Sequence, residues 1–145
     1  MYAPPETILV PLDASKLAAA AVDYAIMLAS ATGASIILYT AIAGDEEAAL
    51  HEFAHYEGIA IDEAADAYLH RVAGSIPDNI TVVRRHGHSH KPAAAIVDFA
   101  IDNGVSMIVM ASHGRSGVAR WRLGSVTTRV LATSPIPVTV IPVRS

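Results

Sequence analysis

The sequence contains no cysteine, which excludes disulfide bonds and thiolate metal sites. No apolar run reaches the roughly 18 residues that a membrane-spanning helix needs, because Asp23 interrupts the longest alanine-rich stretch. Residues 1–6 carry no basic group, and no apolar signal core precedes the first expected strand. These absences predict an intracellular, cytoplasmic protein without a membrane segment.

Acidic residues are missing from the C-terminal part of the chain. Residues 103–145 hold five arginines and no acid, a formal charge of +5, whereas residues 1–102 carry a formal charge of −9. Local positive potential favours a polyanionic ligand, although surface arginines also serve solubility. The net negative charge of residues 1–102 argues against nucleic-acid binding, because nucleic-acid binding depends on many contacts between basic side chains and phosphates.

The length of 145 residues predicts a single domain, residues 1–145, and 52% hydrophobic residues favour elements buried on more than one face. Five apolar segments are predicted as strands: Thr7–Leu12, Ala34–Ala41, Ile80–Arg84, Val105–Met110 and Val138–Ile141. Between them four helical patterns are expected: Asp13 or Ser15 to Thr32, Glu46 to Val72 with a break at Gly58, Pro92 to Asn103, and Ser125 to Thr133. Alternating strands and helices predict an α/β fold, a parallel sheet with helices on both faces.

The most informative stretch is a glycine-rich segment between the fourth strand and the last helix. Residues 111–125 contain three glycines, three arginines and three serines. A loop of this kind before a helix offers free backbone N–H groups to an anion, and phosphate is the first ligand to expect. In a doubly wound sheet such a ligand lies where the strand order reverses, beyond the carboxyl ends of the strands.

Four segments together resemble the universal stress protein family in its single-domain form. They are Ile8–Ser15, Ile108–Gly117, Leu123–Val126 and Pro135–Val140. The resemblance implies a three-layer open sandwich of the adenine-nucleotide alpha hydrolase-like kind, with a five-stranded parallel sheet in the order 3-2-1-4-5. It also implies a homodimer that pairs through the last strand, Val138–Val143.

The resemblance further implies that ATP, or AMP or ADP, binds between strands 1 and 4. Pro11 and Asp13 would flank the nucleoside, Thr40 would offer backbone groups to adenine, and the glycine-rich segment would hold ribose and phosphates. The implied binding residues are Pro11, Leu12, Asp13, Thr40, Met110, Ala111, Ser112, His113, Gly114, Arg115, Ser116, Gly117, Gly124, Ser125, Val126 and Thr127. Magnesium or manganese would be held only through the phosphates, with no metal ligand and no catalytic residue from the protein.

Two positions depart from the family pattern. The ATP-binding branch carries glycine where this chain has Ala111, although Gly114, Gly124 and Ser125 fit the spacing. The segment Gly87–Pro92 is longer than the usual link. Both departures are expected to affect nucleotide affinity rather than the fold. The methyl group of Ala111 either crowds the nucleotide site, or Ala111 adopts ordinary strand geometry and leaves the site unaffected.

Several of these residues have structural interpretations as well. Asp13 is expected to bind the nucleoside or only to cap the first helix, and Ser125 is expected to be an N-cap whether or not it binds phosphate. His86, His88 and His90 alternate, so an extended third strand would place them on one face. A solvated loop is the favoured interpretation over a metal site, because no carboxylate lies within five residues.

Three classes of function remain open from the sequence. The first is an ATP-binding, dimeric stress-response or regulatory module. The second is a stress protein of the branch that binds no nucleotide and acts as a dimeric protein-interaction platform, for which Ala111 is the motivation. The third is an enzyme that uses an adenine nucleotide, but neither Ser-Gly-Gly-x-Asp-Ser nor the His-x-Gly-His and Lys-Met-Ser-Lys-Ser motifs occur, leaving at most slow ATP hydrolysis.

Overall fold

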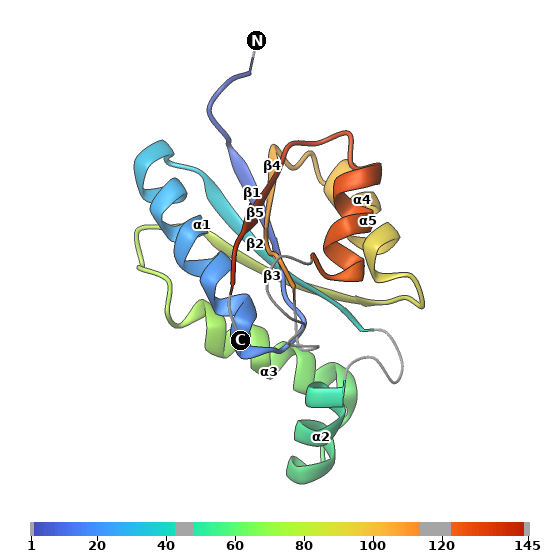
Figure 1. The fold of residues 1–145 in the computed structure, drawn as a ribbon. Coiled ribbons are helices and arrows are strands. Elements are labelled where there is room, and N and C mark those ends of the chain that lie inside the picture. Colours follow the sequence, from blue (N-terminus) through green and yellow to red (C-terminus); the bar gives the residue numbers. More distant parts are fainter. Residues whose placement is uncertain (1, 43–47, 114–122, 144–145) are drawn as a thin grey trace.

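Five parallel strands form the centre of the fold (Figure 1). The computed structural model describes residues 2–42, 48–113 and 123–143. The strands are β1 (Thr7–Pro11), β2 (Ser35–Ile42), β3 (Val82–His88), β4 (Met107–Ala111) and β5 (Val138–Ile141). Their order in the sheet is β3-β2-β1-β4-β5, with every neighbouring pair parallel. The predicted fold class and strand order are therefore confirmed.

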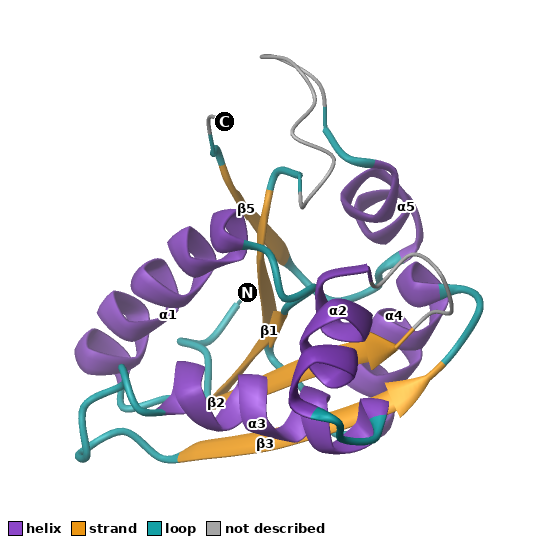
Figure 2. Ribbon diagram, turned by 90° about the horizontal axis from the view of Figure 1, so that it is seen from below, coloured by secondary structure: helices purple, strands orange, loops and turns teal. Residues whose placement is uncertain are grey.

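Helices cover both faces of this sheet, as Figures 1 and 2 show. They are the short 3-10 helix η1 (Lys16–Ala18) and the α-helices α1 (Ala19–Thr32), α2 (Ala48–Glu57), α3 (Ile61–Ala73), α4 (Pro92–Asp102) and α5 (Ser125–Thr133). Helices α1 and α3 pack on one face, and α4 and α5 on the other. No helix in the described part of the chain is long and apolar enough to cross a membrane.

The continuous apolar runs of the strands follow from this double coverage. In β2, Ile36 and Leu38 join the cluster under α1 and α3, whereas Ile37 and Tyr39 join the cluster under α4. The Tyr39 ring stacks on Phe99 of α4 with centroids 4.4 Å apart and an interplanar angle of 14°. Because both faces are buried, apolar side chains occupy successive positions instead of alternating with polar ones.

The helix boundaries agree with the turn residues in the sequence, with one shift. Gly33 and Gly58 have φ angles of 78° and 67°, so each ends a helix in the left-handed region that glycine adopts without steric cost. The break predicted at Gly58 is thereby confirmed. At the other end of α1, Ser15 Oγ accepts a hydrogen bond from Ala18 N at 3.3 Å, so the serine caps the 3-10 turn and α1 itself begins only at Ala19.

The third strand differs most from its prediction. It continues past Arg84 to His88 because it pairs with β2 along the whole of Ile36–Ile42. The carboxylate that the sequence did not place near the histidines comes from α3: Asp62 Oδ1 lies 3.2 Å from His86 Nε2 and 2.7 Å from His88 Nε2. The expectation of a loop is therefore wrong for these two histidines, which belong to a strand, whereas their expected exposure to solvent is confirmed.

A second ion pair extends this row of contacts between β3 and α3. Arg84 Nη1 lies 3.3 Å from Asp66 Oδ1, one helical turn beyond Asp62. His90 follows the end of the strand and, among the described residues, forms no ion pair in this row. Within the described ranges, no group of three or more His, Asp or Glu residues is arranged to hold a metal ion.

The pairing with histidine predicts a pH dependence of stability. The hydrogen bond from His88 is the main cause that lowers the pKa of Asp62 below its ordinary value of 3.8, and the charges of His88 and His86 add to it. Because the pKa is lower in the folded state, the contribution of Asp62 is present above pH 3.8 and is lost as the pH falls through the folded pKa. Asp62→Asn should therefore lower the melting temperature at pH 6 and have a much smaller effect at pH 2.5.

Asp98→Asn provides the control, since Asp98 is an exposed carboxylate on α4, away from the ion pairs between α3 and β3. Melting curves of the three proteins at both pH values give the comparison. An effect of Asp62→Asn that is the same at both pH values would contradict the assignment of stability to the ionised pair.

Candidate functional site

Strands β1 and β4 separate toward their carboxyl ends. Strand β1 is in register with β2 over all of Thr7–Pro11 but with β4 only at Ile8 and Leu9. Beyond Leu9, the chain after β1 bonds to β2, and the chain after β4 bonds to β5. Leu12 N donates to Tyr39 O at 2.8 Å, and Ser112 N donates to Ile141 O at 2.9 Å. The strand order reverses here, which is where ligands bind in open α/β sheets.

The turn that follows β1 has an unusual backbone. Ala14 has a φ angle of 66° and is the only described non-glycine residue with positive φ. The Asp13 carboxylate accepts a hydrogen bond from Ser15 N at 3.0 Å across this residue. Left-handed conformations of residues other than glycine are strained and concentrate at functional sites. No feature of the sequence signals the strain at Ala14, because its neighbours read equally well as a helix cap.

At the end of β4 the chain is tied to the start of α5. Ala111 pairs with Ile141 in the ladder, and its carbonyl oxygen accepts a hydrogen bond from Thr127 Oγ1 at 2.9 Å. The next residue, Ser112, is buried, and its hydroxyl oxygen accepts from Val143 N at 3.1 Å. Ala111 thus has ordinary strand geometry, the second of the two states that the sequence left open.

Gly124 fits closely against this strand end. Its N–H donates to Ser112 O at 2.8 Å, and a Cβ atom at Gly124 would lie 3.2 Å from His113 Cα and 3.3 Å from His113 Cβ. Packing therefore favours glycine here, independently of any phosphate. Gly124 is also the N-cap residue of α5, and Ser125 is its first helical residue. The expectation that Ser125 is the N-cap is wrong by one residue, since Gly124 has extended backbone geometry and its carbonyl oxygen accepts the first helical hydrogen bond, from Thr128 N at 2.9 Å.

Among the described residues, two buried polar atoms at this end of the sheet have no hydrogen-bond partner. They are Thr40 Oγ1, on a residue with no exposed surface, and Nε2 of His113, which is 4% exposed. The other ring nitrogen of His113 lies 3.2 Å from Ser112 Oγ. Buried polar groups are nearly always paired, so each of these atoms needs an explanation, and a bound polar molecule is one. The sequence assigned Thr40 a role only through its backbone and gave His113 no catalytic role; the burial is visible only in the fold.

Most of the predicted binding residues come together at one edge of the sheet. Those in the described residues lie at the carboxyl ends of the adjacent strands β2, β1 and β4 and in the first turn of α5. Gly114, Arg115, Ser116 and Gly117 lie outside the described residues. The binding role of the set stays a prediction.

The contact at Gly124 generates a test of how tightly this site is packed. Gly124→Ala should lower the free energy of unfolding by about 1–3 kcal/mol, because the new methyl group must displace the backbone of His113. Ser125→Ala is the matched control: its side chain is exposed and it is the first helical residue rather than the N-cap, so its effect should stay within about 0.5 kcal/mol. Urea denaturation measures both, and equal stability of the two variants would contradict the packing argument.

A family model and a curated relative match this chain. The model described as the universal stress protein family matches residues 5–142. Universal stress protein MJ0577 of Methanocaldococcus jannaschii is 44% identical over 50 residues, which are 34% of this chain and 31% of that protein. The sequence match to this relative therefore spans about a third of its length.

Solved structures extend the similarity over the whole chain. The structure of MJ0577 has a TM-score of 0.77 and 27% identity, covering 99% of both chains. Universal stress protein UspA from Lactobacillus plantarum has a TM-score of 0.73 and 26% identity, covering 96% of this chain and 99% of that one. A universal stress protein in complex with cAMP has a TM-score of 0.67 at 23% identity, covering 97% and 98% of the two chains, a likeness of fold. With strand order, family model and fold in agreement, the chain belongs to the universal stress protein family.

Proposed function

We propose that this protein is an adenine-nucleotide-binding universal stress protein, a stress-response or regulatory module that takes up ATP, or AMP or ADP. The observation that carries the proposal is the separation of β1 from β4 after Leu9, directly in front of the first turn of α5. A nucleotide placed there would have its nucleoside near the β1 and β2 ends and its phosphates near α5.

The start of α5 suits a phosphate. The first amides of a helix have no partner within it, and the helix dipole favours negative charge at this end. The exposed Ser125 adds a hydroxyl donor beside these amides. The net positive charge of residues 103–145 acts in the same direction by attracting an anion. Magnesium is expected to arrive with the phosphates and not to bind the protein directly.

The buried polar atoms support a polar ligand at the nucleoside end. Thr40 Oγ1, near the carboxyl end of β2, and His113 Nε2, two residues beyond β4, both lack a partner in the part of the chain that the structure describes. The ordinary strand geometry of Ala111 supports the interpretation that its methyl group leaves the site competent. A family member of the same fold that was solved with cAMP also supports an adenine nucleotide as the ligand class.

Mg-ATP should stabilise the fold, and Ser125→Ala should weaken that effect. ATP at 100 times its dissociation constant adds about 2.7 kcal/mol to the free energy of unfolding of a one-site protein. Ser125→Ala is expected to reduce affinity for ATP several-fold and to leave adenosine binding nearly unchanged, because only ATP has phosphates to place at α5. Titration calorimetry on protein verified as nucleotide-free measures both ligands.

Thr133→Ala, in the last turn of the same helix, is the control for helix stability and should bind both ligands like the parent protein. Absence of ATP binding would overturn the proposal and favour the alternative, a dimeric interaction platform that binds no nucleotide. Equal loss of ATP and adenosine in Ser125→Ala would place the serine away from the phosphates.

We also propose that two copies pair through the free edge of β5. Val138–Ile141 is an edge strand whose side chains are all half-buried, and exposed edges of this kind tend to find partners. Ile108 N donates to Pro137 O and Ser112 N to Ile141 O, so odd-numbered positions face β4. In a parallel ladder the backbone of Val140 then faces the free edge.

Val140→Pro should therefore abolish the dimer without breaking the ladder to β4, because proline removes only the outward N–H. Val140→Ala keeps that N–H and is the matched control. Light scattering should give about twice the 15.2 kDa chain mass for the parent protein and for Val140→Ala, and a single chain mass for Val140→Pro. A monomeric parent protein at micromolar concentration would contradict the proposed pairing.

A further inference from the structure

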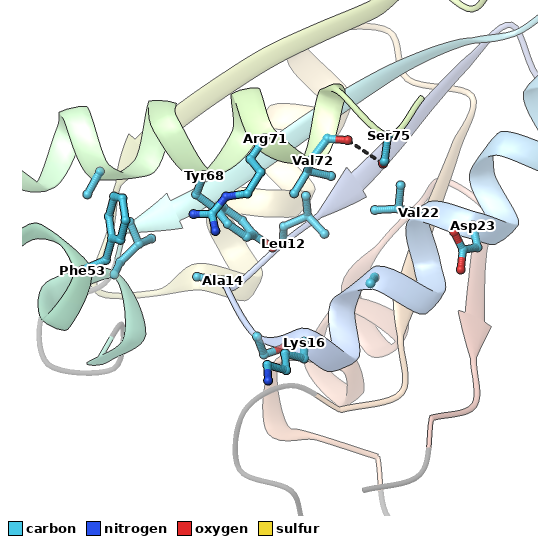
Figure 3. Close-up of a pocket in the computed structure, with 14 residues that line it drawn as sticks. Leu12, Ala14, Lys16, Val22, Asp23, Phe53, Tyr68, Arg71, Val72 and Ser75 are labelled. Carbon is cyan, nitrogen blue, oxygen red and sulfur yellow. Dashed lines mark hydrogen bonds between the residues drawn. The ribbon is translucent and has the colours of Figure 1, made fainter. Parts of the chain in front are cut away.

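A pocket of about 530 Å³ opens on the face of the sheet that α1 and α3 cover (Figure 3). It extends from the turn after β1 along the space between α1 and α3, and α2 closes one end. Its volume lies within the range of about 300–1,000 Å³ that small-molecule sites occupy. Of the described residues predicted to bind nucleotide, Leu12 alone lines it, and the turn residues Ala14 and Ser15 border both, so the pocket adjoins the candidate nucleotide site and extends away from it between α1 and α3.

The walls of the pocket are mainly apolar. Leu12 and Val22 form its floor as parts of the buried core, and Phe53 and Tyr68 add two partly buried aromatic rings from α2 and α3. A ligand with an apolar body would bury surface against these side chains and gain about 25 cal/mol for each Å² removed from water. A fully polar ligand would find few hydrogen-bond partners along these apolar walls.

The charge within the pocket is distributed unevenly. Arg71, Lys16 and Asp23 are its charged lining residues. The Arg71 guanidinium carbon lies 5.6 Å from the centroid of the Phe53 ring, at the opposite end of the pocket from Asp23 (Figure 3). Within the described part of the chain, neither Arg71 nor Lys16 forms an ion pair. The aromatic end therefore presents a cation whose planar fork of donors is open to an anion.

We propose that this pocket is a second ligand site, which binds a small amphipathic carboxylate. The carboxylate would lie against Arg71, because guanidinium donors match carboxylate oxygens in pairs. The apolar body would extend between α1 and α3 toward Val22. A neutral lipid would leave the guanidinium without a partner, and a polyphosphate would lose hydration against apolar walls, so one negative charge on an apolar body fits best.

Decanoate is the probe for this site, used below its aggregation concentration in titration calorimetry. The parent protein should bind it saturably at one site per chain, and decanol, which lacks the charge, should bind at least tenfold more weakly. Arg71→Met keeps the apolar stem of the side chain and removes the charge, so decanoate affinity should fall about tenfold. Arg129→Met is the matched control, because Arg129 is an exposed arginine of α5 outside the pocket, and its affinity should equal that of the parent protein.

Ala19→Phe tests the location by filling the pocket. Ala19 is an exposed lining residue at the first position of α1, so a ring there takes up pocket volume without removing core packing. This variant should lose decanoate binding and keep the melting temperature of the parent protein. If Arg71→Met fails to fold, Ala19→Phe and the comparison with decanol still decide the proposal.

Three results would overturn it. They are absence of saturable decanoate binding to the parent protein, equal affinity of Arg71→Met and Arg129→Met, and displacement of decanoate by ATP, which would assign the ligand to the nucleotide site instead. Failure of ATP to bind leaves this test unaffected, because decanoate is titrated in the absence of nucleotide.

Discussion

Burial of β1 between two helix layers is the constraint on which the rest of the structure depends. Ile8, Leu9 and Val10 are fully buried, and successive side chains of the strand join opposite clusters, one under α1 and α3 and one under α4. A strand in this position needs hydrogen-bond partners on both edges, and β2 and β4 supply them. Because its two neighbours are reached by crossovers in opposite directions, the order of strands reverses at β1.

That reversal explains why polar groups collect at one edge of an otherwise apolar sheet. Beyond Leu9 no further pairing holds β1 to β4, and the chain leaves each strand in a different direction. The gap is bounded by the strained turn at Ala14 on one side and by the close contact between Gly124 and His113 on the other. Both features hold backbone in place around the gap, which is the preorganisation that a binding site requires.

The two outer strands of the sheet, β3 and β5, differ in the charged contacts of their side chains. Strand β3 is flanked by a row of charged contacts to α3, in which Asp62 and Asp66 meet His86, His88 and Arg84. Such polar contacts make an edge a poor template for further pairing. In the described residues, β5 has no such row of charged contacts. Its four side chains are half-buried, as expected for a strand that packs against a partner. The difference favours β5 over β3 as the place where a second copy pairs.

The sequence by itself determined the alternation of five strands with helices and the boundaries of the last helix and strand. The spacing of apolar residues and the turn-forming residues are local signals in the sequence. They correctly place the last helix at Ser125–Thr133 and the last strand at Val138–Ile141. The family resemblance added the order of the strands and the list of binding residues.

Tertiary structure alone decided the contacts between elements that are distant in the chain. The third strand reaches His88 because β2 offers an edge along Ile36–Ile42, and Asp62 meets the histidines because α3 crosses that strand. The close contact between Gly124 and His113, the His113 ring nitrogen without a partner among the described residues, and the pocket beside Arg71 depend in the same way on packing between segments. Local patterns carry no information about such contacts, because the partner residues lie many positions away and the geometry exists only once the layers have packed.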